Sequence, residues 1–293
     1  MHVILVFNPI SGRGAGQHRA AAIGEVLAGR GHVAELVPSE TGDAARWLGE
    51  RLASVDAVVV VGGDGTVRSV AGVVAAAGIP LLHVPGGNEN LFARGLGMTG
   101  DVDAVVAAVE RGQRRDVDMA TANGETMLLM ASVGLDAEIV AEVAARRGRT
   151  VSNWTYARAA LSQLRRCTPP RCSVVVDGNE VVSGQTGWCV VANSPLYGGR
   201  INPAPMAKLD DGLLDMVFFP ASTSLGVLRW MNRCRRGRQS ARAGFVHRTA
   251  ASDVEITVDE PARLQIDGDP AAGGEPVGRV QVIRSPQSLV VLA

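Results

Sequence analysis

Four consecutive valines, residues 58–61, run directly into Gly62-Gly63-Asp64-Gly65-Thr66, and no other stretch constrains the fold as strongly. An unbroken run of β-branched residues is typical of a strand that is buried on both faces in a parallel sheet. Residues 67–77 are small and apolar and predict a helix. Glycines between a strand and a helix let the backbone approach an anion, which the amides at the helix start can bind. This stretch predicts a phosphate site, the alternative being a tight turn that binds nothing.

Asp64 is the unusual member of this turn, because a carboxylate beside a phosphate repels it unless a cation intervenes. Two interpretations follow. Either Asp64 faces a magnesium ion that accompanies a nucleotide phosphate, or it is an acid that handles a proton.

The composition indicates a packed globular protein without a bulk charge signal. The chain has 293 residues, of which 46% are hydrophobic and 20% charged, and its 29 basic residues balance its 29 acidic residues. We therefore expect no nucleic-acid partner. The four cysteines form no Cys-x-x-Cys pair, which favours a reducing compartment. The N-terminus resembles no signal peptide, and no apolar run reaches the ~20 residues of a membrane span, so we expect a cytoplasmic protein.

Strands and helices alternate over the first 111 residues. This order predicts βαβ units and a parallel sheet, with ligands beyond the carboxyl ends of the strands. The loops that start at Asn8, Thr41, Gly62 and Gly86 would then share one edge. The predicted strands are 3–7, 33–37, 55–61 and 79–84, and the predicted helices are 17–28, 44–52, 67–77, one beginning near 91, and 101–111.

The pattern changes near Asp116, after which short strands dominate. Asn123-Gly124 and Asp177-Gly178 are strong signals for hairpin turns. We interpret residues from about 119 onward as a second, β-rich domain of the sandwich type. Its predicted strands are 115–122, 126–133, 172–176, 180–182, 187–192, 213–219, 254–258, 263–266 and 279–283, with helices at 137–147, 154–166 and 222–234.

Three sequence motifs stand out: Asn8-Pro9-x-Ser11-Gly12, Gly62-Gly63-Asp64-Gly65-Thr66, and residues 85–94 (Pro-Gly-Gly-Asn-Glu-Asn-Leu-Phe-Ala-Arg). They are accompanied by Asp118, Gly134-x-Asp136-Ala137, Asn193, Gly198-Gly199, Pro205-Met206-Ala207, residues 210–215, and Asp267-Gly268-Asp269. In this order, the motifs resemble those of the diacylglycerol kinase catalytic family, which includes bacterial soluble lipid kinases and is related to the sphingosine and ceramide kinases. GGDGT also occurs in NAD kinases and phosphofructokinases, but those enzymes lack the segment that matches residues 85–94 and the late Asp267-Gly268-Asp269 motif.

The resemblance implies an α/β fold: an N-terminal Rossmann-like nucleotide-binding domain, of the NAD kinase and phosphofructokinase type, and a C-terminal β-sandwich. We expect the first domain to cover residues 1–118, completed by a returning strand within 285–293, and the lipid-substrate domain to cover 119–284.

The resemblance also implies an activity, ATP-dependent phosphorylation of a lipid hydroxyl such as that of diacylglycerol. Such transfer needs a positioned triphosphate, neutralised charge and a deprotonated acceptor. Asp64 would orient Mg²⁺, and Asp269 would be the general base. The residues implied to contact ATP are Asn8, Pro9, Ser11, Gly12, Arg13, Thr41, Gly62, Gly63, Asp64, Gly65, Thr66, Gly87, Asn88 and Asn90.

A second, structural metal site is implied in bacterial members of the family. Its ligands would be the carbonyls of Lys208 and Leu213 and the carboxylate of Asp211, with Asp118 reaching the waters of the metal. Oxygen ligands with retained water suit magnesium. The alternative is a solvated turn, since Asp and Gly are common turn residues.

The sequence departs from the family pattern in three places. Asn88 replaces a threonine, and Leu91 replaces a frequent acid. Arg68 and Ser69 stand where the family has the polar pair Asn-Glu after GGDGT and one further residue. These changes keep open a regulator that binds nucleotide or lipid with weakened catalysis. An NAD kinase-like enzyme is a further alternative, which residues 85–94 disfavour.

Arginines near Trp230 and Met231 suit a peripheral, anionic membrane surface, or equally a solvated basic helix end. They are Arg229, Arg233, Arg235, Arg236, Arg238, Arg242 and Arg248. A similar group is Arg146, Arg147, Arg149 and Trp154. The expected partners are a lipid alcohol and a membrane surface, and a homodimer is left open.

Overall fold

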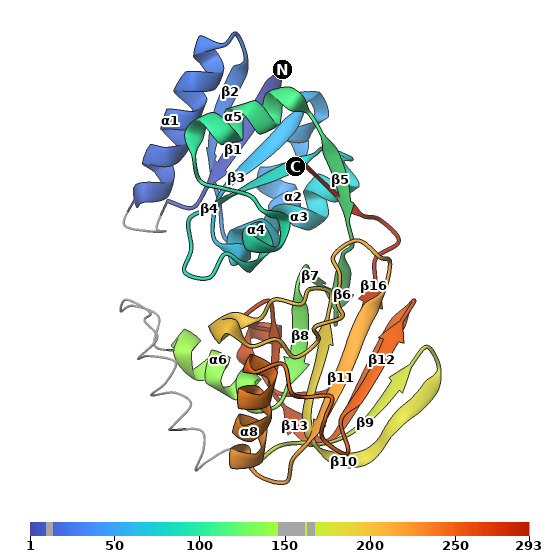
Figure 1. Cartoon of the computed structure of the whole chain (residues 1–293). Helices are drawn as coiled ribbons and strands as arrows, with labels where there is room; N and C mark the ends of the chain where they lie inside the picture. Colours follow the sequence, from blue (N-terminus) through green and yellow to red (C-terminus); the bar gives the residue numbers. More distant parts are fainter. Residues whose placement is uncertain (10–13, 146–161, 163–167, 293) are drawn as a thin grey trace. The chain divides into compact units, whose positions relative to one another are not determined.

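The computed structural model describes residues 1–9, 14–145, 162 and 168–292 (Figure 1). The chain divides into two compact units. Unit 1 comprises residues 1–119 and 286–293, and unit 2 comprises residues 120–285.

Unit 1 is built on a six-stranded sheet in the order β2-β1-β3-β4-β17-β5. All neighbouring pairs are parallel except the antiparallel pair of β17 with β5. Its strands are β1 (His2–Phe7), β2 (Val33–Pro38), β3 (Ala57–Gly62), β4 (Leu81–Pro85), β5 (Arg114–Val117) and β17 (Leu289–Leu292). The predicted parallel sheet is therefore confirmed, with the late strand β17 in its interior.

Helices cover both faces of this sheet. Alternate residues of β1 and β3 pack with α1 and α5 in one apolar cluster, and α3 packs on β3 as well. Both central strands are buried almost throughout, as an uninterrupted valine run predicts. The helices of unit 1 are α1 (Ala15–Gly29), α2 (Ala44–Trp47), η2 (Gly49–Ser54), α3 (Asp64–Ala76), α4 (Leu91–Leu96) and α5 (Val102–Arg111).

The prediction of one helix over residues 44–52 was wrong. The α-helical turn α2 ends at Trp47, and the chain continues from Gly49 as the 3₁₀ helix η2. Glycine is a poor α-helix former, so a change of helix type at this position is physically reasonable.

The strand register brings the carboxyl ends of neighbouring strands together. Phe7 pairs with Pro38 and Val61, and Gly62 pairs with Pro85. The loops after β1, β2, β3 and β4 therefore start from one edge, where α/β sheets bind ligands.

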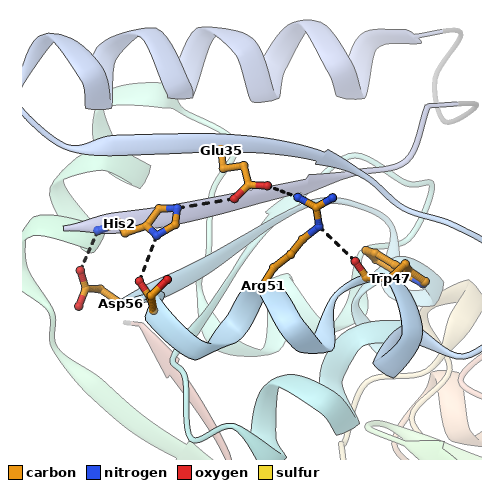
Figure 2. A network of polar contacts seen from close by, with 6 residues as sticks. His2, Glu35, Trp47, Arg51 and Asp56 are labelled. Atoms are coloured by element: carbon orange, nitrogen blue, oxygen red, sulfur yellow. Dashed lines mark hydrogen bonds and ion pairs between the residues drawn. The ribbon is translucent and has the colours of Figure 1, made fainter.

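The opposite edge of the sheet is fastened by a polar network (Figure 2). The amide of His2 donates to Asp56 at 2.7 Å, and the imidazole of His2 lies 3.7 Å from the carboxylate of Glu35. Glu35 also pairs with Arg51, which donates to the carbonyl of Trp47 at 3.3 Å. The side chain of Arg51 is half exposed, so its ion pair with Glu35 contributes little to the stability of the fold.

Unit 2 is a β-sandwich, which confirms the predicted fold class. One layer contains β14, β8, β10, β11 and β12, and the other contains β10, β9, β13, β16, β6 and β7. A single apolar cluster draws residues from both layers. Its strands are β6 (Ala120–Ala122), β7 (Glu125–Met127), β8 (Met130–Val133), β9 (Arg171–Val176), β10 (Asn179–Ala192), β11 (Leu214–Pro220), β12 (Val246–Ala250), β13 (Asp253–Ala262), β14 (Leu264–Ile266), β15 (Asp269–Pro270) and β16 (Val277–Arg284). Its helices are α6 (Leu135–Ala145), η3 (Gly198–Arg200), α8 (Ser224–Arg235) and η4 (Ala272–Gly274).

Two of the predicted strands, 180–182 and 187–192, are one continuous strand, β10. Register shifts interrupt its pairing with β9, and Gly184 adopts a positive φ of 50° between them. An irregularity of this kind bends a strand, and here β10 passes from one layer to the other. Strand β12 was not predicted. The predicted helix 154–166 lies outside the described residues apart from position 162, and the arginine group at 146–149 lies outside them entirely.

Both predicted hairpin turns are confirmed. Asn123-Gly124 joins β6 to β7, Asp177-Gly178 joins β9 to β10, and both residues of each turn have positive φ. Positive φ at both central residues is the geometry that makes Asn-Gly and Asp-Gly favourable here.

Within the described part of the chain, no helix is both long enough and apolar enough to cross a bilayer.

Candidate functional site

Two glycine turns at the sheet edge of unit 1 approach each other backbone to backbone. The amide of Gly86 donates to the carbonyl of Gly62 at 2.8 Å. A Cβ added to Gly87 would lie 2.7 Å from the Cα of Gly63, and a Cβ added to Gly63 would lie 3.2 Å from the Cα of Gly87. Any side chain would therefore force the turns apart, which explains why both positions are glycine.

The first of these turns leads into the N-terminus of α3. Gly63 is the N-cap residue of α3 and has no side chain with which to satisfy the first-turn amides. Thr66 is buried, and its side chain packs against Gly62, where an added Cβ would lie 2.7 Å from Oγ1. A 13-residue helix that starts without a side-chain cap can bind an anion at this end.

The carboxylate of Asp64 binds the N-terminus of the next helix. Its two oxygens accept hydrogen bonds from the amides of Leu91 and Phe92, each at 2.9 Å. These are the first two residues of α4, whose N-cap residue Asn90 provides no side-chain cap. Helix α4 thus stabilises the charge of Asp64, which reduces the repulsion expected beside a phosphate.

Asn90 closes the second glycine turn. It adopts a positive φ of 48°, its side-chain oxygen accepts from the amide of Gly87 at 2.7 Å, and its side-chain nitrogen donates to the Gly87 carbonyl at 2.8 Å. Asparagine tolerates this backbone conformation better than most residues. The structure therefore gives Asn90 a clear role in shaping the turn.

His83, which the sequence reasoning missed, supports the first turn from inside the sheet. Its Nε2 lies 2.9 Å from the carbonyl oxygen of Gly62, and the side chain is fully buried. Burial lowers the pKa of His83, against the opposing effects of this hydrogen bond and the charge of Asp64. A neutral imidazole that donates from Nε2 fits these contacts, and it fixes the carbonyl of Gly62 at the start of the turn.

The other residues predicted to contact nucleotide follow the same edge. Asn8 and Pro9 follow β1, and the amide of Asn8 donates to the carbonyl of Val61 at 3.4 Å. Thr41 is exposed in the loop after β2, and Asn88 is exposed in the second glycine turn. Ser11, Gly12 and Arg13 lie outside the described residues. Arg19 of α1, which was not predicted, donates to the carbonyl of Pro85 at 2.8 Å.

In unit 2 the predicted catalytic acid, Asp269, follows a tight hairpin turn. Asp267 and Gly268 have φ values of 51° and 86° and join β14 to β15, where Ile266 pairs with Asp269. The carboxylate of Asp267 accepts from the amides of Leu128, Leu129 and Met130, each at 2.8 Å. Asp267 therefore anchors the turn, and half-buried Asp269 is the first residue beyond it.

A buried polar cluster lies behind this turn. Gln265 accepts from the amide of Gly268 at 2.8 Å and donates to the hydroxyl of Ser132 at 2.7 Å. Ser132 and Tyr197 both donate to the carboxylate of Asp136. We refer to Gln265, Ser132, Tyr197 and Asp136 as the polar cluster.

Burial has a strong effect on the acidic groups of the polar cluster. It raises the pKa of Asp136, although the hydroxyls of Ser132 and Tyr197 partly oppose this. Burial likewise raises the pKa of Tyr197 well above its usual value, and the charge of Asp136 adds to the effect. Through Gln265, the hydrogen bonds of the cluster connect the core of unit 2 with the turn before Asp269.

Of the four residues predicted to form the structural metal site, Lys208, Asp211 and Leu213 belong to unit 2, and Asp118 belongs to unit 1. Asp211 is exposed, and one of its oxygens accepts from the amide of Leu213 at 3.1 Å in a turn that contains Gly212 at a φ of 72°. Lys208 is exposed in the same loop. Among the described residues, no three His, Cys, Asp or Glu side chains gather closely enough to hold a metal ion. An all-oxygen site with a single carboxylate and backbone carbonyls still suits magnesium.

Comparison with known proteins covers both units. The model of the diacylglycerol kinase catalytic domain matches residues 2–122, and the model described as the YegS C-terminal NAD kinase beta sandwich-like domain matches residues 130–293. A diacylglycerol kinase of Mycobacterium tuberculosis (strain ATCC 25618 / H37Rv) is 31% identical over 235 residues, which is 78% of this chain and 76% of the relative. A diacylglycerol kinase of Bacillus subtilis (strain 168) is 25% identical over 90% of this chain and 88% of its own.

The fold agrees with solved structures. A crystal structure of a candidate diacylglycerol kinase from Bacillus anthracis str. Sterne superposes with a TM-score of 0.77 at 22% identity, covering 99% of this chain and 94% of the other. The two family models together span nearly all of both units. This chain belongs to the diacylglycerol kinase catalytic-domain family and is a lipid kinase-like protein with the family's second, sandwich domain.

Proposed function

We propose that this protein is an ATP-dependent lipid kinase that transfers the γ-phosphoryl group of ATP to a lipid hydroxyl, such as that of diacylglycerol. The observation that carries the proposal is the pair of glycine turns at the sheet edge. They leave no room for a Cβ, and they precede a helix N-terminus without a side-chain cap. Phosphate groups fit such a backbone surface.

In the proposed reaction, the lipid oxygen forms a bond to the γ-phosphorus as the bond to the β-phosphate oxygen breaks. Asp269 takes the proton of the lipid hydroxyl, and the products are ADP and a lipid phosphate. Magnesium, when bound with ATP, would neutralise phosphate charge. The residues of this chain position the phosphates through backbone amides and hold Asp269 through the turn at Asp267 and Gly268.

Purified protein incubated with ATP labelled in the γ-phosphate, magnesium and a panel of lipid alcohols tests the proposal. We expect labelled lipid phosphate from at least one of them, formed about 100-fold or more slowly by the Asp269→Asn variant. Label on NAD and on no lipid would contradict the lipid kinase proposal.

A second candidate is a regulator that binds nucleotide with little turnover. The contact of Asp64 with α4 favours it, because both oxygens of that carboxylate already accept hydrogen bonds. The replacements at Asn88, Leu91 and Ser69 point the same way. Nucleotide binding without label transfer to any lipid would favour this candidate.

A membrane-resident substrate would require the protein to approach a bilayer. We therefore include an anionic membrane surface among the proposed partners, since arginines of α8 and the following turn are exposed in unit 2.

A further inference from the structure

Helix α8 of unit 2 presents one apolar face and one arginine face. Its buried residues recur every three or four positions and pack against the sandwich. Arg229, Arg233 and Arg236 follow one another at spacings of four and three, which places them on a common outer face. Ordinary packing explains the buried face, but it gives no reason for arginine at all three outer positions.

The chain after α8 returns along this outer face. Gly237 has a φ of 61°, and the amide of Arg238 donates to the carbonyl of Arg233 at 3.0 Å, so the helix ends in a tight reversal. This reversal adds Arg238 and Arg242 to the arginines of the helix. Five arginines and Asn232 then line a hollow of about 260 Å³, which we name the arginine hollow: Arg229, Asn232, Arg233, Arg236, Arg238 and Arg242.

One arginine of the hollow is held by a buried aromatic side chain. The guanidinium of Arg242 lies 5.1 Å from the ring centroid of Trp230. Trp230 is buried and donates from its indole nitrogen to the carbonyl of Pro220 at 2.8 Å. A cation held over a fixed indole ring is restricted in its orientation, which prepares it to bind a ligand.

The positive charge of the hollow is not balanced by acidic neighbours. In the described parts of the chain, none of its five arginines pairs with an acid. Elsewhere Arg30 and Arg279, for example, bind Glu110 and Glu255 at 2.7 Å. The chain as a whole has a net charge of zero, so this concentration of charge is local. Unbalanced like charges repel one another, and an anion in the hollow would relieve the repulsion.

We propose that the arginine hollow is a binding site for a phosphate group, separate from the glycine turns of unit 1. The planar, forked donors of arginine match the tetrahedral oxygens of phosphate, and the hollow contains no lysine. An adjoining hollow of about 370 Å³ shares Arg229 and Arg242 with it and is otherwise lined by uncharged residues, including Trp230 and residues at the α8 N-terminus. It offers space for the uncharged part of a phosphate monoester.

Two double variants with equal loss of charge test this proposal. Arg233→Gln with Arg236→Gln removes two guanidinium groups from the hollow. Arg235→Gln with Arg248→Gln removes two arginines that lie outside it, one of them on α8 itself. Arg235, Arg236 and Arg248 are exposed and Arg233 is half-buried, so both double variants should fold, which thermal unfolding checks. Arg236→Gln alone replaces the first double variant if that one does not fold.

Calorimetric titration with inorganic phosphate, on the full chain without nucleotide, gives the first measurement. We expect the hollow variant to bind about 100-fold more weakly than wild type, since each arginine contributes about tenfold through charge-assisted hydrogen bonds. The control variant should bind as wild type does. The second measurement is sedimentation with phosphatidylcholine vesicles that carry phosphatidic acid, a monoester, or phosphatidylglycerol, a diester, at matched surface charge.

Binding of inorganic phosphate that only the hollow variant loses assigns the site to soluble phosphate compounds. A preference for phosphatidic acid that only the hollow variant loses assigns it to a lipid headgroup. An equal loss in both double variants, or no loss in either, overturns the proposal and leaves a diffuse basic surface. Neither measurement uses ATP turnover, so a failure of the kinase proposal would not affect these outcomes.

Discussion

The side-chain oxygen of Gln265 accepts a hydrogen bond from the amide of Gly268 at 2.8 Å. Gly268 directly precedes Asp269, so this single bond connects the buried polar cluster with the proposed general base. Gln265 is almost fully buried, and its amide nitrogen is held by Ser132 at 2.7 Å. The position of Asp269 therefore depends on a residue that does not itself reach the reacting atoms.

Replacing Gln265 by methionine keeps the volume of the side chain and removes its hydrogen bonds with Gly268, Ser132 and Tyr197. We expect kcat for lipid phosphorylation to fall about tenfold, the cost of a misplaced general base, while the KM for ATP stays unchanged. Ser132→Ala serves as the control, because it leaves the contact with Gly268 in place. Steady-state kinetics of both variants provide the measurement, and an equal fall in the two would contradict a positioning role for Gln265.

Replacing Asp269 should affect mainly turnover, whereas replacing Asp267 should affect mainly stability. Asp269→Asn should lower turnover by about 100-fold or more, the scale of a lost general base, and leave nucleotide binding intact. Asp267→Asn should instead lower stability by about 2 kcal/mol, because one amide oxygen cannot replace two carboxylate oxygens on three backbone amides. Urea unfolding and label transfer, measured on both variants, separate these effects. Similar mild effects in both variants would exclude Asp269 as the base and turn attention to Asp64.

Asp64→Asn should affect both activity and stability. The asparagine keeps one acceptor for the two α4 amides, so we expect a loss of about 1 kcal/mol of stability. We also expect label transfer to fall about 100-fold, because the neutral side chain would no longer orient the magnesium ion that accompanies ATP. Asp101→Ala is the matched control, since Asp101 caps α5 in the same unit through the amide of Ala104 at 2.9 Å. If Asp101→Ala lowers transfer as much, helix capping explains the effect of Asp64→Asn and a direct role at the phosphates does not.

Alanine at the facing glycines should weaken nucleotide binding in a definite order. The Cβ of Gly87→Ala would meet the Cα of Gly63 at 2.7 Å, whereas that of Gly63→Ala would meet Gly87 at 3.2 Å. We expect a rise in the Kd for ATP of about tenfold or more for Gly87→Ala and a smaller rise for Gly63→Ala. Gly29→Ala, where a Cβ meets nothing within 4 Å, should leave the affinity unchanged. A reversed order would show that the turns relax easily and that contact between them is unimportant.

Asp177 should make the stability of the sandwich depend measurably on pH in the acidic range. Burial tends to raise the pKa of Asp177, but the amides of Ala251, Ser252 and Asp253 and the hydroxyl of Ser252 outweigh it and lower the pKa to about 2. The unfolded value is about 3.9, so Asp177 stabilises the fold fully above pH 4 and loses this effect as the pH falls toward 2. Asp177→Asn, which keeps a favourable residue for the turn, should be less stable than wild type at pH 6. Urea unfolding at several pH values should show the difference shrinking below pH 4, and a constant difference would contradict this linkage.

How much of this molecule its sequence predicts depends on the range of the interactions involved. The valine run, the glycine turns and the hairpins at Asn123 and Asp177 follow from local backbone preferences, and the structure confirms these elements. The hairpin at Asp267 was missed although it has the same dipeptide, because β15 is only two residues long and includes Pro270.

His83 and Gln265 were missed for a different reason. Each is a single polar residue within an apolar strand, and the pattern of a buried strand does not reveal its purpose. Their partners are set by tertiary structure: Gly62 lies 21 positions from His83, and Ser132 lies 133 positions from Gln265. Interactions of this range have no signature in one sequence, which is also why the contact of Asp64 with α4 could not be foreseen.

The position of strand β17 in the sheet determines when unit 1 can be completed during synthesis. It lies between β4 and β5 in the sheet of unit 1, yet the ribosome makes its residues 289–292 only after the whole of unit 2. Until then β4 and β5 have no strand between them, and buried Leu289 and Val291 are missing from the interior. The sandwich, which is continuous in the chain, can fold as soon as it emerges. The domain made first is thus completed last, so a nascent chain acquires its proposed nucleotide-binding unit only when translation has passed residue 292.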